Sequence, residues 1–241
     1  MMEKVFRSRG IRLLRNQDGS TQEQQKIYYE PNGCWIEHKQ LNFWMEEDLL
    51  SLFEYSEVNG MVDTYNFHVH LENEQYNKIY SGLDEKSLAV IDVIPSVFDA
   101  SFRNYTVGYQ IANGEIARSA YYYYPTIWKE TRYGIKGIED TAIISDEISR
   151  FANYVVADQQ SKDEIEDFGR IIYKLKGISI HFREDLCGYK LYGRCNKSKL
   201  QAFLANRMKV NLESYDYGDV VLVAQRIQFG CVAGYNLYFM K

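Results

Sequence analysis

The sequence predicts an α+β protein whose core is an antiparallel β-barrel of repeated helix–hairpin units, with the helices outside. Three observations support this prediction. Paired segments of alternating apolar and polar residues, separated by turn residues, recur along the chain as in β-hairpins. Helical spacing fills most of the intervals between these pairs. The 241 residues also include 21 tyrosines and only 3 prolines, a composition that favours strands.

The length allows one large domain or two small ones, and we expect a single globular domain, residues 1–241, that binds neither nucleic acid nor membrane. Hydrophobic residues make up 46% and charged residues 25%, as in ordinary globular proteins. A net charge of -5 disfavours a nucleic-acid footprint, and no run of about 18 apolar residues could span a membrane. The cysteines form no CxxC pair, which is typical of reduced thiols in a cytoplasmic protein. They are Cys34, Cys187, Cys195 and Cys231.

The first half of the chain begins with residues 1–24, a basic and then polar stretch that we expect to be frayed or at a sheet edge. Residues 26–44 form a predicted hairpin around a Pro-Asn-Gly turn. The leucine spacing in residues 46–55 suits a short helix. Residues 64–82 form the next predicted hairpin. Residues 84–100 suit a helix that a proline interrupts or ends.

The second half repeats the alternation of helices and hairpins. Residues 104–125 form a predicted hairpin around Asn113-Gly114, and residues 128–141 a loop. Ser145 resembles the N-cap of a helix that continues to about residue 155. Four further elements follow: helices over 162–175 and 196–208, and hairpins over 178–194 and 220–240.

The polar faces of the predicted hairpins place a cation close to a tyrosine. The segments are Lys26-x-Tyr28, Lys78-x-Tyr80, Arg118-x-x-x-Tyr122, Lys190-x-Tyr192-x-Arg194 and Asn236-x-Tyr238. In an open sheet this face is exposed to water, and its residues are ordinary surface residues. In a closed barrel it lines a lumen. Lysines and arginines in a lumen suit a polyanion such as diphosphate, and phenols could stabilise a carbocation.

These helix–hairpin units with Lys-x-Tyr strands resemble the ABBA-type aromatic prenyltransferases, and the last strand, residues 234–241, is similar to the end of several members. The resemblance covers about residues 26–241. It implies transfer of a dimethylallyl or geranyl group from its diphosphate to an aromatic acceptor, which is an indole, a phenol, or a Trp or Tyr of a peptide. No cofactor is required, and the sequence leaves open whether Mg²⁺ assists. Asn236 stands where the family pattern has a cation.

The resemblance also implies roles for individual residues. The diphosphate would be bound by Lys78, Arg118, Arg183, Lys190 and Arg226. The allylic cation would be shielded by Tyr80, Tyr122, Tyr192 and Tyr238. A carboxylate must accept the proton that the aromatic acceptor loses. Glu72 is the first choice for this base, and Glu30 and Glu37 are alternatives.

Two other classes of function stay open. His68-x-His70-x-x-x-Glu74 resembles the first metal-binding motif of cupins, in which alternate strand residues converge on one metal. His38 or His181 would then have to complete the ligand set. The other alternative is a non-catalytic β-rich binding module that uses its tyrosines as a contact surface. No Asp-Asp-x-x-Asp run is present, which argues against a metal-chelating prenyl site of the terpene-synthase type.

Overall fold

The structure of the chain is a computed structural model. Its described backbone comprises residues 4–31, 50–58, 61–70, 104–112, 115–124, 129–131, 134–136, 138–183, 186–213, 215 and 220–239. Its described side chains are those of residues 9–27, 138–178, 188–213, 215 and 222–239.

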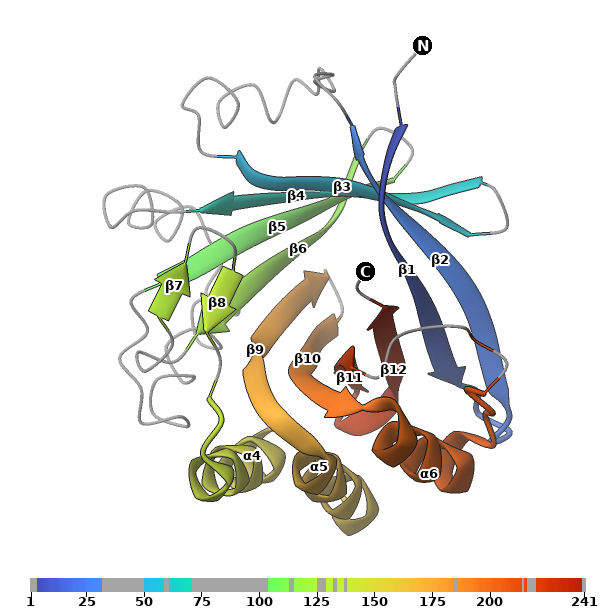
Figure 1. The fold of residues 1–241 in the computed structure, drawn as a ribbon, viewed down its shortest axis with the longest axis vertical. Coiled ribbons are helices and arrows are strands. Elements are labelled where there is room, and N and C mark those ends of the chain that lie inside the picture. Colours follow the sequence, from blue (N-terminus) through green and yellow to red (C-terminus); the bar gives the residue numbers. More distant parts are fainter. Residues whose placement is uncertain are drawn as a thin grey trace.

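The described strands form one large antiparallel sheet and one small hairpin. The large sheet contains β1 (Lys4–Arg15), β2 (Thr21–Pro31), β3 (Leu50–Val58), β4 (Met61–His70), β5 (Asn104–Ala112), β6 (Glu115–Tyr124), β9 (Ile172–Arg183), β10 (Leu186–Asn196), β11 (Val220–Gln228) and β12 (Cys231–Phe239). Their pairing order is β1-β12-β11-β10-β9-β6-β5-β4-β3-β2, and β2 pairs again with β1, which is the strand order of a closed barrel (Figure 1). The α+β class and the antiparallel sheet are therefore confirmed.

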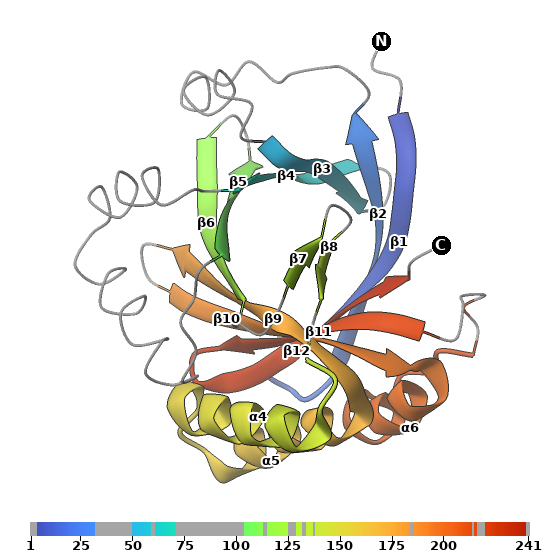
Figure 2. The same ribbon diagram turned by 60° about the vertical axis from the view of Figure 1, so that its left-hand side comes forward.

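Three described helices lie together on one side of the sheet, outside β9–β12 (Figure 2). They are α4 (Thr141–Val155), α5 (Gln159–Ile171) and α6 (Lys197–Met208). The Asp140 carboxylate accepts hydrogen bonds from the backbone N–H groups of Ala142 and Ile143 in α4, and the Asp158 carboxylate accepts one from the backbone N–H of Ser161 in α5. These caps satisfy amide groups that have no partner within the helix. Ser145 lies inside α4, so its predicted role as N-cap is wrong.

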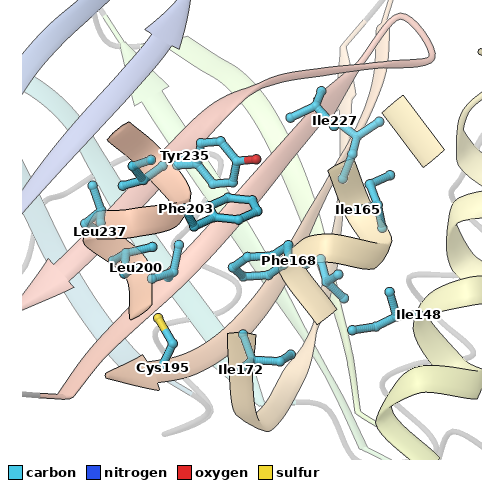
Figure 3. Packing of buried hydrophobic residues seen from close by; sticks show 14 of the residues in the cluster. Ile148, Ile165, Phe168, Ile172, Cys195, Leu200, Phe203, Ile227, Tyr235 and Leu237 are labelled. Carbon is cyan, nitrogen blue, oxygen red and sulfur yellow. The ribbon is translucent and has the colours of Figure 1, made fainter. Parts of the chain in front are cut away.

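The hydrophobic core fills the space between these helices and the sheet. Alternate residues of each strand point to the same face, so Leu13, Leu191 and Leu237 all face the helices and are buried. Phe168 of α5 and Phe203 of α6 pack against them (Figure 3). The Phe203 ring meets the Tyr235 ring edge to face, with centroids 5.6 Å apart.

Gly234 allows β1 to approach β12 closely. Its φ of +145° is a conformation that side chains rarely adopt. A Cβ atom there would lie only 2.0 Å from the Leu13 carbonyl oxygen. The pairing of the two ends of the chain therefore requires glycine at this position.

The N-terminal half differs most from the sequence-based expectation. Residues 4–24 are neither frayed nor at an edge, because β1 pairs with both β2 and β12 and buries Ile11 and Leu13. The first hairpin is β1–β2, so residues 26–31 complete its second strand instead of opening a hairpin, and the rest of 26–44 lies outside the described residues. Residues 50–55, expected to be helical, belong to β3.

Other elements differ less from the ranges expected from the sequence. β4 pairs with β3 and β5, and the expected return strand and helix over residues 71–100 lie outside the described residues. The expected loop at 128–141 contains β7 (Lys129–Thr131) and β8 (Gly134–Lys136). The helix expected over 162–175 starts earlier and ends at Ile171, because β9 begins at Ile172. The paired strands expected within 104–125, 178–194 and 220–240 and the helix at 196–208 are confirmed.

Candidate functional site

The candidate site is the inner face of the sheet, defined as the face of β9–β12, β1 and β2 opposite to the helices. Its residues alternate with the core residues along each strand. On β10, for example, Leu191 and Cys195 are fully buried against the helices, and Tyr192 and Arg194 belong to the inner face. The polar inner-face residues with described side chains include Arg12, Gln24, Lys26, Lys190, Tyr192, Arg194, Arg226, Asn236 and Tyr238.

Strand register brings these residues into adjacent cross-strand rows. Lys190 stands directly opposite Arg226, so two cations face each other on neighbouring strands. Such like-charged pairs are destabilising on an ordinary sheet surface. Tyr192 lies opposite Ala224, which in turn lies opposite Asn236. The second row continues from Asn236 to Arg12 and Gln24.

A third row joins the same face to the N-terminal strands. Arg194 lies opposite Leu222, which pairs with Tyr238. Tyr238 lies opposite Gly10, and Gly10 opposite Lys26. Cations therefore occur on β10, β11, β1 and β2, and no described side chain on this face is a carboxylate. The face has a positive electrostatic character although the chain as a whole is acidic.

Several of these polar side chains are deeply buried. Lys26, Arg226 and Asn236 expose only 4%, 8% and 4% of their surface. Cationic residues are rarely buried to this extent unless they bind a partner. The Asn236 amide nitrogen donates to the Tyr238 hydroxyl at 3.3 Å, whereas its carbonyl oxygen accepts no hydrogen bond from the described residues. Arg12 donates to the Gln24 side chain at 3.3 Å.

Lys176 lies at an irregularity of β9. Tyr192 pairs with Gly177 and Gly193 with Leu175, so Lys176 is the extra residue of a β-bulge. Burial and the positive charges of Arg194 and Lys174 lower the pKa of Lys176 to about 8. Lys174 itself forms an ion pair with Glu139, with Nζ and Oε1 2.5 Å apart.

Four of the predicted site residues share the inner face. Lys190, Arg226, Tyr192 and Tyr238 lie on three adjacent strands, in the rows described above. This agrees with the alternation on which their prediction was based.

The other predicted site residues are described only in part or lie outside the described residues. The backbone of Tyr122 lies opposite Ser179, which lies opposite Lys190, and Arg118 lies opposite Gln110. Arg183 lies at the end of β9, and Glu30 near the end of β2. The side chains of these residues are not among those described. Outside the described residues lie Glu37, His38, Glu72, Glu74, Lys78 and Tyr80.

The histidines of the alternative metal site are spread over the sheet. His68 and His181 occupy one cross-strand row, with Gly108 and Ala120 on the two strands between them. His70 lies in the row that contains Tyr122 and Lys190. Among the residues the structure describes, no group of three His, Cys, Asp or Glu side chains could hold a metal ion.

Sequence reasoning did not assign a role to Arg12, Lys26, Lys176, Arg194 or Asn236. Lys26 and Arg194 belong to the Lys-x-Tyr pattern, so the pattern already contained a signal for both. Arg12 was missed because its segment was expected to be frayed. Lys176 was missed because a bulge interrupts the two-residue period.

A different polar cluster lies on the helix side of the same strands. The fully buried Tyr235 donates its hydroxyl to Glu164 of α5 at 2.6 Å, and Arg15 binds both oxygens of Glu164 at 2.9 and 3.1 Å. Gln225 donates to the Tyr235 oxygen at 3.1 Å. Burial, followed by the charge of Glu164, raises the pKa of Tyr235 well above its usual value. This cluster connects α5 to β1, β11 and β12.

Comparisons with known proteins do not assign the chain to a family. No family model matches the sequence, and a search of the curated proteins finds no relative. Within the described part of the chain, none of the helices has the length and apolar character needed to cross a membrane.

Proposed function

We propose that the inner face binds the diphosphate of an allylic ester and that the protein transfers the allylic group to an aromatic acceptor. The observation that carries this proposal is the row in which Lys190 faces Arg226, next to the row that contains Tyr192. Two cations on adjacent strands can together donate charge-assisted hydrogen bonds to the oxygens of one diphosphate. Arg226 is also largely buried, which strengthens such contacts.

The chemistry follows from this arrangement. The bond between C1 of the allylic group and the diphosphate oxygen breaks, and the diphosphate leaves with the electron pair. Lys190 and Arg226 favour this step because they stabilise the charge that develops on the leaving group. Tyr192 and Tyr238 offer π faces to the allylic cation. An aromatic carbon of the acceptor then forms the new bond to C1 and loses its proton to a base.

Residues beyond Lys190, Arg226, Tyr192 and Tyr238 complete this proposal. Glu72 remains our choice for the base, because the described inner face offers no carboxylate. Tyr122 would join the shield, because its backbone shares a row with Lys190. Lys78, Tyr80, Arg118 and Arg183 keep their proposed roles. We further propose a lumen inside a ring of helix–hairpin units, a cytoplasmic location and a reaction that requires no cofactor.

Titration calorimetry with dimethylallyl thiodiphosphate, which resists ionisation, tests the proposal. We expect binding by the full chain with and without EDTA. Lys190→Met and Arg226→Met should each weaken it by about ten- to a hundredfold, the effect of losing one hydrogen bond to a charged group. Lys199→Met, at an exposed lysine of α6, is the matched control and should bind normally. Equal binding by all four proteins would contradict the proposal.

Turnover separates a transferase from a binding module. A protein that binds the analogue should also transfer the dimethylallyl group from the natural diphosphate to an indole or phenol, measured as a mass gain on the acceptor. Glu72→Gln should slow this reaction without weakening analogue binding. Binding without transfer to any of these acceptors would favour the non-catalytic module.

A further inference from the structure

Asn236 is a buried amide on the inner face. Its neighbours in the chain, Tyr235 and Leu237, belong to the core between the sheet and the helices (Figure 3). The alternation of side chains along β12 therefore turns Asn236 to the inner face, where it exposes only 4% of its surface. In its cross-strand row, Ala224 of β11 lies on one side and Arg12 of β1 on the other.

The two polar atoms of the Asn236 amide differ in their hydrogen bonding. The nitrogen donates along β12 to the Tyr238 hydroxyl at 3.3 Å. Because the two atoms diverge from one planar carbon, the oxygen points away from Tyr238. This oxygen is fully buried, and none of the residues that the structure describes donates a hydrogen bond to it. A buried acceptor of this kind destabilises the protein until a donor reaches it.

The chemistry of the inner face limits which ligand supplies that donor. The lysines and arginines of this face can only donate. The Gln24 oxygen accepts from Arg12, and the Tyr238 oxygen accepts from Asn236. A phenol can accept from any of the cations, whereas a ring whose polar atom only donates needs an acceptor such as the Asn236 oxygen. An indole is such a ring, because its N–H donates and does not accept.

The neighbours of Asn236 on the inner face have little or no side chain. Ala224 lies directly opposite on β11, and Gly234 lies two residues earlier on β12. Tyr192 lies beyond Ala224 in the same row, two strands and thus about 9.5 Å from Asn236. A ring in van der Waals contact on both faces occupies about 7–8 Å. One flat ring therefore matches the interval over Ala224, between Tyr192 and Asn236.

We propose that Asn236 and Ala224 form a subsite for an indole ring. The ring N–H donates to the Asn236 oxygen, and the ring packs over Ala224 against the Tyr192 phenol. Because Ala224 is fully buried, the incoming ring displaces the side chains that cover it. Binding therefore combines burial of an apolar ring with one hydrogen bond to an acceptor that lacks a donor among the described residues.

The role of this ring as the prenyl acceptor rests on the proposed function. Arg226 lies opposite Gly234 and hence diagonally across from Asn236, so a diphosphate on Arg226 would lie beside the ring. When a ring carbon forms the new bond to C1, positive charge spreads to the indole nitrogen. The Asn236 oxygen stabilises this charge through the N–H. The reacting carbon then loses its proton to the base.

Titration of the full chain with indole and with benzofuran, followed by ligand-observed NMR, tests the subsite. Benzofuran has the shape of indole but an oxygen in place of the N–H, so it cannot donate. We expect indole to bind about tenfold more tightly, the effect of one hydrogen bond. N-acetyltryptophanamide identifies the source of the ring: tighter binding than indole indicates the tryptophan of a peptide, and weaker binding a free indole. Equal binding of indole and benzofuran would overturn the proposal.

Variants assign the preference to Asn236. Asn236→Leu should bind indole as weakly as benzofuran, whereas Asn236→Asp keeps an acceptor oxygen and should keep the preference. Ala224→Val should weaken both rings equally, because it narrows the subsite without removing the acceptor. Asn206→Leu, at an exposed asparagine of α6, is the matched control. Circular dichroism checks folding, and Asn236→Ala repeats the test if leucine is not accommodated. A preference for indole that survives in both apolar variants would refute the subsite.

The calorimetric assay keeps this inference separate from the proposed function. Asn236→Leu should bind the thiodiphosphate analogue as the unmodified protein does, because it leaves Lys190 and Arg226 intact. If the unmodified protein prefers indole through Asn236 but does not bind the analogue, the subsite stands and the prenyl-transfer proposal fails. If it binds the analogue but shows no preference for indole, the subsite fails and the diphosphate site stands.

Discussion

The strands β10–β12 and β1 carry very different side chains on their two faces. The helix-facing side carries Leu13, Leu191 and Leu237, which are buried in the main core. The inner side of the same strands carries Arg12, Lys190 and other cations. The helix-facing side is therefore largely apolar, whereas the inner side is rich in cations.

The buried polar groups on the two faces have different charged neighbours. On the helix side, the Glu164 carboxylate accepts hydrogen bonds from Tyr235 and Arg15, so its charge is compensated within the protein. On the inner side, Lys190 faces Arg226, and Lys176 lies near Arg194. The first arrangement stabilises the fold, and the second brings like charges together on one face of the sheet. Substitutions on the two faces should therefore have different consequences.

The largest effect on stability is expected from Phe168→Ala on the helix side. The Phe168 side chain is fully buried and packs against Phe203 and Tyr235. Removal of a buried phenyl ring costs about 3–5 kcal/mol of unfolding free energy. Urea denaturation followed by circular dichroism measures this change.

Arg226→Met is the matched substitution on the inner side. It removes a buried charge but keeps an unbranched side chain, so we expect it to change stability by less than about 1 kcal/mol, or to increase it. A destabilisation as large as that of Phe168→Ala would show that Arg226 supports the fold. The contrast between the two faces would then be wrong.

An intermediate loss of unfolding free energy is expected from Glu164→Gln. The substitution removes the charge that Arg15 binds and weakens the hydrogen bond from the buried Tyr235 hydroxyl. The loss of a charged partner in a largely buried site costs about 1–3 kcal/mol. Tyr235→Phe should cost less, about 1 kcal/mol, because it leaves the Arg15–Glu164 ion pair intact.

A double-mutant cycle tests whether Glu164 and Tyr235 act together. The double substitution should cost less than the sum of the two single substitutions, because Glu164→Gln weakens and Tyr235→Phe removes the same hydrogen bond. The unfolding free energies of all four proteins supply this comparison. Strictly additive costs would mean that the 2.6 Å contact between Tyr235 and Glu164 contributes nothing to stability.

Much of the inner face was predictable, because the alternation of polar and apolar residues within a single strand already assigns each residue to a face. Lys190, Tyr192 and Arg194 alternate with apolar residues over a short hairpin, and a two-residue period assigns them to one face without knowledge of the fold. The same holds for Asn236 and Tyr238 on β12. The helices were also recognisable, because their apolar residues recur at helical spacing.

The remaining parts depend on contacts between distant segments or on irregular geometry. The basic residues of β1 look like a solvated segment until β12, from the other end of the chain, pairs with them. Leu50, Leu52 and Phe53 fit a short helix and a strand almost equally well, and the pairing of β3 with β4 decides the outcome. Lys176 joins the inner face through a bulge that a regular alternation cannot represent.

The smallest predicted change in unfolding free energy is that of Lys176→Met, which should stabilise the protein, whereas the substitutions on the helix side destabilise it. The pKa of Lys176 is about 8 in the folded protein and close to its usual value of 10.5 in the unfolded chain. Below pH 8 the side chain is charged in both states, so the cost of burying its charge is fully present. Between pH 8 and 10.5 the unfolded chain binds more protons, so this cost is relieved as the pH rises.

We therefore expect Lys176→Met to stabilise the protein at pH 7, by up to about 1 kcal/mol after allowance for the half-exposed position of the side chain. The advantage should shrink by pH 9. Because burial raises the pKa of Cys195 to about 12, its folding contribution also changes with pH, and only the difference between the two proteins is informative. Urea midpoints in a phosphate-free buffer measure this difference. An advantage that is equally large at pH 7 and pH 9 would contradict this prediction.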